Sequence, residues 1–253
     1  QILENNLDDH ADFILRRLQS PPQTNEVRRA GVMLPGYLTI AGASGLPIVL
    51  SEIGSSAGLN LLWDQYNYRL GDTSWGKAES AVTIAPEWIG PPPPVAAIQV
   101  ISRAGCDLLP IDPASAEDRT RLLSYIWADQ ADRMALTRAA LETAVAMPVQ
   151  VDRENAISWL DKRLSVTHEG AIHVINHTIM WQYMGPSDRQ RGRDLIVAAG
   201  NRATDGAPLA WLRLEADSAG PGAALMLTLW PTGSEKCIGR ADFHGRWIIW
   251  TGW

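Results

Sequence analysis

The chain has 253 residues, enough for one α/β domain with a sizeable core. It carries 22 basic and 28 acidic side chains, and the resulting net charge of −6 argues against a general nucleic-acid-binding surface. No apolar run approaches the ~20 residues that a membrane span requires, so we expect no membrane partner. The two cysteines, Cys106 and Cys237, lie far apart and form no C-x-x-C pair, which favours a reduced, cytoplasmic protein.

Residues 1–45 are expected to form a helical segment. Apolar residues recur at helical spacing over residues 2–18, which predicts an amphipathic helix. A second helix is expected over residues 26–41, capped by Thr24 or Asn25 and kinked or stopped near Pro35-Gly36.

An α/β domain is expected over residues 46–253. It opens with a strand over residues 46–53, and a helix follows directly after Gly58. An excursion over about residues 66–95 is rich in aromatic residues and Gly turns, so we expect a hairpin or an irregular region there.

The rest of the chain alternates strands with helices. The expected elements are a strand within residues 98–106, two helices within 116–145, a short strand before a helix capped by Asn155, a strand over 171–175, a helix capped by Ser187, and three strands within 208–217, 223–231 and 245–250. This alternation predicts a mainly parallel sheet flanked by helices, a Rossmann-like arrangement.

The segment IVLSEIGSSAGLNLLWD, residues 48–64, joins a strand to a helix through a turn rich in Gly and Ser. As G-x-S-x-G it matches the nucleophile elbow of a serine hydrolase, with Ser56 as nucleophile and His244 downstream. Only one strand precedes Ser56, however, whereas such an elbow normally follows several. No His-Gly-Gly run supplies a second oxyanion donor either. The hydrolase therefore stays as an alternative.

The same segment also suits a loop that holds a nucleoside. Gly54 and Gly58 let the backbone turn tightly and approach a ligand, with Ser56 between them. The spacing differs from the G-x-G-x-x-G of diphosphate-binding loops. Glu52, at the end of the strand, would repel a diphosphate, so the pattern favours a cofactor with a cationic group.

LSEIGSSAGLNL resembles motif I of the class I S-adenosylmethionine-dependent methyltransferases, whose usual form is acid-x-Gly-x-Gly-x-Gly. Ser56 replaces the middle glycine. The resemblance implies a Rossmann-like methyltransferase fold with S-adenosylmethionine as cofactor. It also implies that Glu52, Gly54, Ser56 and Gly58 contact that cofactor.

Three later segments resemble the parts that follow in this family. RAGCDLLP provides Asp107 as the acid for the ribose hydroxyls, and VQVDRENAISWL provides Asn155 and Ala156 beside the adenine. AIHVINHTIMW places Asn176 and His177 at the methyl-transfer site, where His177 would act as base or orienter. A departure from the family is the long stretch between the first two strands, where the family usually has one helix.

A longer resemblance covers most of the chain. PQTNEVRRA, EIGSSAGLNLLWDQYNYRLG, RAGCDLLPID and INHTIMWQYM resemble the signature segments of an uncharacterised bacterial family, domain of unknown function 2332. This resemblance implies family membership but names no reaction. By analogy with the fold, Asn25, Glu26 and Arg29, which precede the first strand, are expected to cover the cofactor.

We therefore expect an S-adenosylmethionine-dependent methyltransferase that acts on a small-molecule or protein acceptor. A non-catalytic nucleoside-binding protein on the same fold is the second possibility, because NHTIM lacks an Asp/Asn-Pro-Pro-aromatic signature. The Ser56 hydrolase is the third. His, Cys and acidic residues show no metal-ligand spacing, so no metal site is expected.

Overall fold

The computed structural model describes residues 7–18 and 23–253. Its largest feature is a nine-stranded sheet in the order β5-β12-β11-β10-β9-β8-β1-β6-β7, beside a three-stranded sheet in the order β3-β2-β4. The strands are β1 (Ile48–Ile53), β2 (Asn67–Leu70), β3 (Thr73–Gly76), β4 (Thr83–Ile84), β5 (Glu87–Ile89), β6 (Val100–Asp107), β7 (Gln150–Arg153), β8 (Ile172–Thr178), β9 (Leu209–Ala216), β10 (Ala223–Trp230), β11 (Ser234–Ala241) and β12 (Trp247–Trp250).

The part of the large sheet that alternates with helices is parallel. β1 lies between β6 and β8, with β7 outside β6 and β9 outside β8. The chain therefore builds outward from β1 to β7 and then returns to the other side for β8 and β9. The strand order reverses between β1 and β8. In doubly wound sheets, ligands bind at such a switch point, outside the carboxyl ends of the strands.

The rest of the large sheet is mainly antiparallel. β9 to β12 pair in sequence as an antiparallel meander, and β5 adds a parallel strand beyond β12. The prediction of a mostly parallel sheet flanked by helices is confirmed, and the three predicted C-terminal strands are β9, β10 and β12. β11 was missed because SEKCIGRA shows no regular apolar alternation and begins with four exposed residues. Its pairing with β10 makes it a strand.

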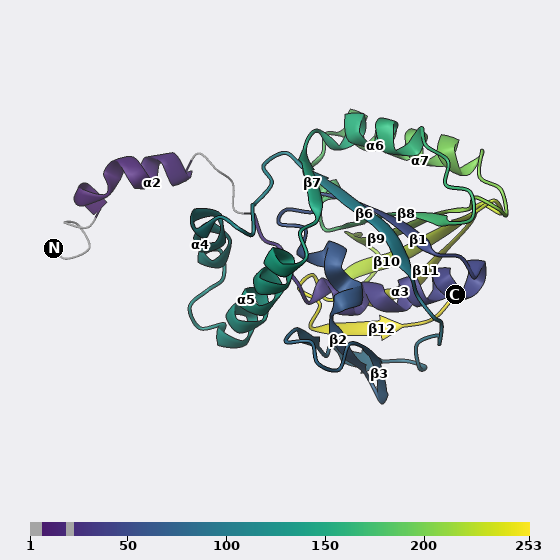
Figure 1. Ribbon diagram of the computed structural model, residues 1–253, viewed down its shortest axis with the longest axis horizontal. Helices are drawn as coiled ribbons and strands as arrows, with labels where there is room; N and C mark the ends of the chain where they lie inside the picture. Colours follow the sequence, from purple (N-terminus) through teal and green to yellow (C-terminus); the bar gives the residue numbers. More distant parts are fainter. Residues whose placement is uncertain (1–6, 19–22) are drawn as a thin grey trace.

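Helices cover both faces of the large sheet (Figure 1). α6 and α7 pack together on one face, whereas α3 and η1 lie on the other, with α5 against η1. None of the described helices is long and apolar enough to cross a membrane. The helices are α2 (Ala11–Leu18), α3 (Arg29–Ser44), η1 (Leu59–Gln65), α4 (Ala116–Ser124), α5 (Ala131–Ala146), α6 (Ala156–Leu164), η2 (Trp181–Tyr183) and α7 (Pro186–Gly200).

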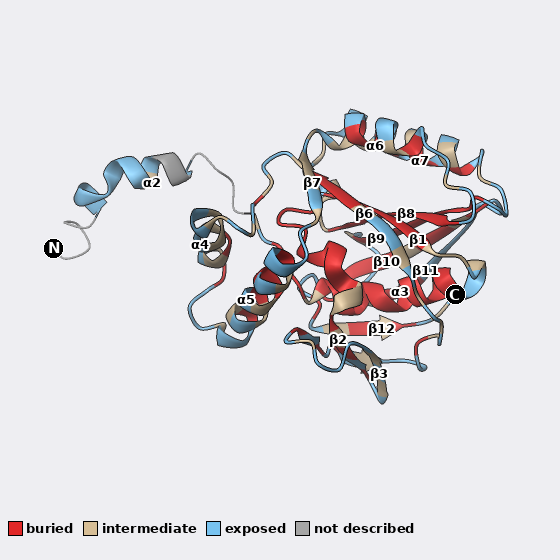
Figure 2. Ribbon diagram, in the orientation of Figure 1, coloured by how far each residue is buried: buried red, intermediate tan, exposed pale blue. Residues whose placement is uncertain are grey.

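Strand side chains point alternately into two hydrophobic cores, as the pleat of a sheet requires. In β9, Leu212 and Leu214 face the core built with α3 and η1, whereas Leu209 and Trp211 face the core built with α6 and α7. Because β9 is covered on both faces, it reads as a nearly continuous apolar run. Buried residues are concentrated in the central strands and α3 (Figure 2).

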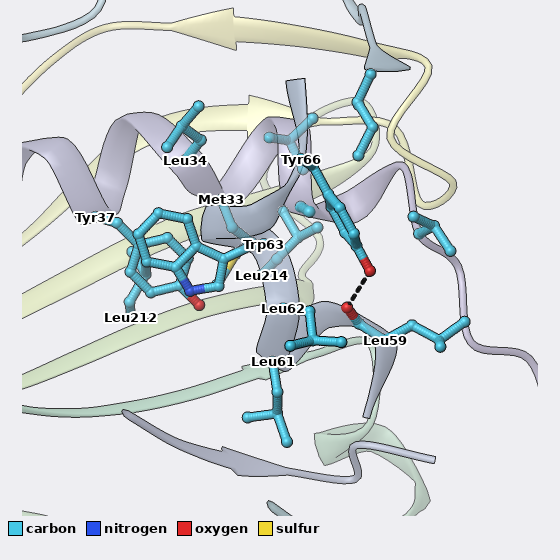
Figure 3. Close-up of a cluster of buried hydrophobic side chains, with 14 of the residues drawn as sticks. Met33, Leu34, Tyr37, Leu59, Leu61, Leu62, Trp63, Tyr66, Leu212 and Leu214 are labelled. Atoms are coloured by element: carbon cyan, nitrogen blue, oxygen red, sulfur yellow. Dashed lines mark hydrogen bonds between the residues drawn. The ribbon is translucent and has the colours of Figure 1, made fainter. Parts of the chain in front are cut away.

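The core beside α3 contains several aromatic side chains (Figure 3). Tyr37 stacks on Trp63 with ring centroids 4.2 Å apart. The Tyr66 hydroxyl donates a hydrogen bond to the Leu59 carbonyl at 2.6 Å, which satisfies a polar group that would otherwise be costly to bury. This packing fixes η1, and with it the far end of the loop that leaves β1.

The second helix differs from its prediction. α3 spans Arg29–Ser44 and continues through Pro35, so of the two predicted outcomes, a kink or a stop, the stop is wrong. A proline inside a helix costs about 3 kcal/mol, but this helix is buried over most of its length, and that burial outweighs the cost. Gly36 allows α3 to pack closely against β9, because a Cβ at this position would lie 2.6 Å from Leu212 Cδ1.

Two other helix starts can be compared with their predictions. Asn155 caps α6 as predicted, because its Oδ1 accepts the N–H of Ile157 at 2.8 Å. α7 instead starts at Pro186, with Gly185 at the cap position and no side-chain cap, so the prediction of Ser187 as cap is wrong. Proline suits the first helical position because its missing N–H would have no partner there.

The predicted N-terminal helix lies partly outside the described residues, since residues 1–6 are not described and α2 begins at Ala11. In the predicted excursion, β2 and β3 form an antiparallel hairpin around Gly71, so the hairpin is confirmed. β4 then pairs in parallel with β2.

Candidate functional site

The loop after β1, residues 54–58, turns sharply at three left-handed positions. Gly54, Ser56 and Gly58 have φ values of 69°, 55° and 70°. Glycine adopts such angles readily, whereas a Cβ makes them unfavourable, so Ser56 is strained. A Cβ at Gly58 would also lie 2.7 Å from Val149 Cγ2, so close packing requires a glycine there. This geometry lets the backbone come close to a ligand.

Neighbouring β6 holds the first part of this loop. The N–H groups of Gly54 and Ser55 donate to the Cys106 carbonyl at 2.9 and 3.1 Å. Gly105 permits the close approach, because a Cβ there would lie 2.2 Å from Ser55 Oγ. Burial raises the pKa of the Cys106 thiol to about 12, so this cysteine is a neutral wall residue at physiological pH.

Asp107, at the end of β6, holds the middle of the loop. Its Oδ2 accepts the N–H of Ser56 at 3.0 Å, and its Oδ1 accepts the N–H of Leu109 and the side-chain amide of Gln23, both at 2.9 Å. A carboxylate offers about four acceptor positions. Oδ2 therefore keeps capacity for a ligand hydroxyl.

A cavity of 340 Å³, here called the main cavity, lies at the carboxyl ends of β1, β6, β7 and β8. Of the residues predicted to form the site, Gly54, Asp107, Asn155 and Ala156 line it. The predicted residues outside its lining are Glu52, Ser56, Gly58, Asn176 and His177. Its remaining charged lining residues are Arg29, Glu154 and Asp188. The sheet thus brings together side chains from four strand ends that are far apart in sequence.

Glu52, at the end of β1, is 3 % exposed. Burial and the charge of Asp107 raise the pKa of this carboxyl to about 8, against the lowering effects of Arg29 and of a hydrogen bond with Asn176. A glutamate in this environment is mainly protonated at neutral pH. A cationic group beside it would favour its ionised form.

A second, small cavity of 10 Å³ adjoins Glu52. Within the described part of the chain, four buried polar atoms on its wall have no hydrogen-bond partner: Glu52 Oε2, Asn60 Oδ1, Asn176 Oδ1 and Trp63 Nε1. Buried polar atoms are normally paired. The volume is about that of one water-sized group, such as an ammonium. The convergence of these atoms indicates a position for a small polar group.

Arg29, in the first turn of α3, lines both cavities. Its Nε donates to the Phe243 carbonyl at 2.8 Å and its Nη1 donates to the Thr178 carbonyl at 3.3 Å. Burial lowers the pKa of this guanidinium, while the charges of Glu26 and Glu215 raise it. Because arginine stays charged in proteins, it provides a positive charge at the boundary between the cavities.

The two other residues expected to cover the cofactor, Asn25 and Glu26, lie outside the lining of the main cavity. Asn25 Oδ1 accepts the N–H groups of Ala57 and Leu59 at 3.1 and 3.2 Å. It therefore holds the loop after β1. The cap position of α3 is Arg28, without a side-chain cap, so the prediction of Thr24 or Asn25 as cap is wrong. Glu26 pairs with Arg133 Nε at 2.7 Å.

His177 is fully buried in β8, and both of its ring nitrogens are bonded. Nε2 accepts from Trp211 Nε1 at 3.0 Å, so the ring proton lies on Nδ1, which donates to Glu215 Oε1 at 2.6 Å. The ring also stacks on Trp181. This geometry favours a structural role over that of a base, because no ring nitrogen is left to meet a substrate.

The Ser56 hydroxyl is buried, and its Oγ has no hydrogen-bond partner among the described residues. A nucleophilic serine needs a base within hydrogen-bonding reach. His244, the histidine downstream, instead lies with Nδ1 3.4 Å from Glu26 Oε2. The arrangement therefore offers no support for the hydrolase alternative. Within residues 7–18 and 23–253, no group of three or more His, Cys, Asp or Glu side chains could hold a metal ion.

The site contains residues that were not anticipated from the sequence, among them Tyr183 and Asp188 in the lining of the main cavity and Glu215 and Asn60 outside that lining. Glu215 interrupts the apolar pattern of β9, a signal that a charged side chain is paired inside the fold. Asn60, in η1, carries no comparable signal, because only the folded chain brings it and Glu52 to the wall of one cavity.

The chain was also compared with known proteins. No curated protein and no solved structure matches it. The family described as "Uncharacterized protein conserved in bacteria (DUF2332)" matches residues 1–250. Because this match spans almost the whole chain, the protein belongs to that bacterial family.

Proposed function

We propose that this protein binds S-adenosylmethionine in the main cavity and transfers its methyl group to a small-molecule or protein acceptor. The observation that carries the proposal is the charge of the cavity wall at the switch point. Asp107, Glu154 and Asp188 line the cavity against a single arginine, Arg29. Such a wall suits a cationic nucleoside and disfavours a diphosphate.

The strand arrangement supports the same proposal. The parallel order β7-β6-β1-β8-β9 followed by an antiparallel edge is compatible with a Rossmann-like methyltransferase fold. In that arrangement, Asp107 would accept the ribose hydroxyls, and Asn155 and Ala156 would lie beside the adenine. Gly54 would allow the loop to approach the ligand without a Cβ in the way.

The residues around the small cavity fit the amino-acid end of this cofactor. An ammonium has three N–H donors, and Glu52, Asn60 and Asn176 each present an unpaired buried oxygen. Arg29, which lines both cavities, would pair with the carboxylate. When bound, the cofactor supplies an activated methyl group on a sulfonium.

The protein would contribute mainly by positioning the cofactor and the acceptor and by excluding water. Aligning two reactants can supply a large part of a rate enhancement, and a sulfonium is already a good leaving group. In the strand order, β8 lies on one side of β1, whereas β6 and β7, which carry Asp107 and Asn155 at their ends, lie on the other. The cavity is lined at the end of β8 by Thr178, Ile179 and Met180. The acceptor would lie there.

A non-catalytic nucleoside-binding protein is the second candidate. The observation in its favour is that both ring nitrogens of His177 are committed to other side chains. A protein that binds the cofactor without transferring its methyl group would need the cavity but no base.

Calorimetric titration with S-adenosylmethionine, S-adenosylhomocysteine and ATP tests the proposal. We expect micromolar binding of the first two ligands and none of ATP. Asp107→Asn should weaken binding at least tenfold, and the control Asp112→Asn, outside the main cavity, should not. If the folded intact protein binds neither S-adenosyl compound, the proposal is wrong. Transfer of labelled methyl groups into bacterial extract separates an enzyme from the non-catalytic alternative.

A further inference from the structure

The part of the main cavity beyond the nucleoside positions is built from one continuous segment. After β8, the chain passes through η2 into α7, and its lining residues are Thr178, Ile179, Met180, Tyr183, Met184, Gly185 and Asp188, here called the β8–α7 wall. The segment keeps a fixed shape at its start, because Ile179 has φ 51° and its N–H donates to the Leu214 carbonyl at 2.8 Å. The wall is therefore a defined surface.

The charged side chains that line the main cavity differ in the number of hydrogen bonds they already make. Glu154 accepts a hydrogen bond from Lys162 Nζ at 2.6 Å, and Asp107 accepts three hydrogen bonds. Arg29 donates to two backbone carbonyls. Asp188 has no hydrogen-bond or ion-pair partner among the residues that the structure describes. Among the carboxylates in the lining, it is the one with no partner in the described part of the chain.

The other side chains of the wall are apolar or aromatic. Tyr183 is 80 % exposed, although a tyrosine ring normally gains by burial against a partner. Met180 and Met184 line the same surface, and thioethers adapt readily to apolar ligands of different shape. An aromatic face also attracts a cation held near it. The wall thus combines an apolar surface with one free negative charge.

We propose that the β8–α7 wall binds an amine whose ammonium pairs with Asp188 and whose apolar body packs on Tyr183, Met180 and Met184. Under the proposed function this amine is the methyl acceptor, and only that assignment rests on it. The ammonium would give one proton to Asp188, and the freed nitrogen would form the bond to the methyl carbon as the bond between sulfur and methyl breaks. The neutral thioether S-adenosylhomocysteine would be the leaving group. A carboxylate or phosphate ligand on the wall would meet the charge of Asp188. Arg29, the cationic residue in the lining of the main cavity, already donates to the Phe243 and Thr178 carbonyls.

Three probes with the same ring test the head group: 2-phenylethylamine, 2-phenylethanol and 3-phenylpropionate. Binding is followed by the methyl signals of protein labelled at its 6 methionines. We expect the amine to shift the Met180 and Met184 signals, assigned with Met180→Leu and Met184→Leu, and to leave buried Met33 unmoved. The propionate should bind more weakly than the alcohol.

Asp188→Asn should weaken amine binding about threefold to fivefold, the upper part of the range for an exposed ion pair, and leave alcohol binding unchanged. Asp194→Asn is the matched control, since Asp194 lies on the same helix outside the cavity lining and accepts from Gln190 at 2.8 Å. Tighter binding of the propionate, or equal amine affinity in Asp188→Asn, would overturn the proposal. No cofactor is added in this experiment, so it tests amine binding independently of the S-adenosylmethionine titration. Either proposal can therefore fail while the other stands.

Discussion

His177 Nδ1 donates a hydrogen bond to Glu215 Oε1 across 2.6 Å, which joins the end of β8 to β9. The same oxygen accepts the N–H groups of Met180 and Trp181 at 3.1 and 3.2 Å. One carboxylate oxygen therefore holds the histidine and the start of the β8–α7 wall. Glu215 thus holds the start of the wall, and the bond from His177 orients its carboxylate.

Glu215→Gln should destabilise the protein and loosen this wall. The substitution keeps the shape but removes the charge that strengthens three hydrogen bonds, so we expect a loss of about 1–2 kcal/mol in the free energy of unfolding. Urea unfolding measures the loss, and the exposed Glu79→Gln serves as control. An unchanged unfolding midpoint would show that the carboxylate charge contributes nothing here.

Glu52→Gln should change how stability depends on pH. The folded pKa of Glu52 is about 8 against an ordinary value of 4.5, so between these values the folded state holds a proton that the unfolded state has lost. The contribution of Glu52 to the free energy of unfolding is complete below pH 4.5. This contribution is lost as the pH rises through about 8, by at most about 1.4 kcal/mol per pH unit.

The free energy of unfolding should therefore fall less steeply from pH 5 to pH 9 in Glu52→Gln than in the natural protein. Urea unfolding at pH 5, 7 and 9 gives both slopes. Parallel slopes would mean that Glu52 titrates normally in the folded protein.

Gly105→Ala should displace the loop after β1. The new Cβ would lie 2.2 Å from Ser55 Oγ and 2.7 Å from Ser55 Cβ, so rotating the serine hydroxyl cannot relieve the overlap. Overpacking of this kind costs about 1–3 kcal/mol, and binding of the proposed cofactor should weaken with it. Gly42→Ala is the control, because the nearest atom to its Cβ is 3.9 Å away. Equal thermal stability of the two variants would contradict the requirement for glycine at position 105.

Ser56→Gly should stabilise the protein by about 0.5–1 kcal/mol, since it relieves a left-handed residue at φ 55° and removes an unpaired buried hydroxyl. Thermal unfolding measures the gain, and Ser55→Gly provides a comparison at a neighbouring serine for which no positive φ is recorded. A destabilised Ser56→Gly would indicate that the hydroxyl makes a favourable contact.

Several features of the site follow from local sequence. The apolar run before Glu52 and the glycines after it specify a strand and a tight turn, because few residues other than glycine tolerate left-handed angles. Asn155 as a cap follows from its position before an amphipathic stretch. The carboxyl ends of parallel strands share one edge, so Glu52, Asp107 and Asn155 were expected near each other, and Asp107 and Asn155 do line one cavity.

The hydrogen-bond partners of individual buried side chains depend on packing between distant segments. The sequence predicted His177 as base or orienter, whereas Glu215 and Trp211, from another strand, occupy both of its ring nitrogens. β11 exists because β10 supplies its hydrogen-bond partners. Local pattern specifies backbone conformation because sterics act between neighbours, whereas the state of a buried polar group depends on partners tens of residues away, which only the folded chain brings within reach.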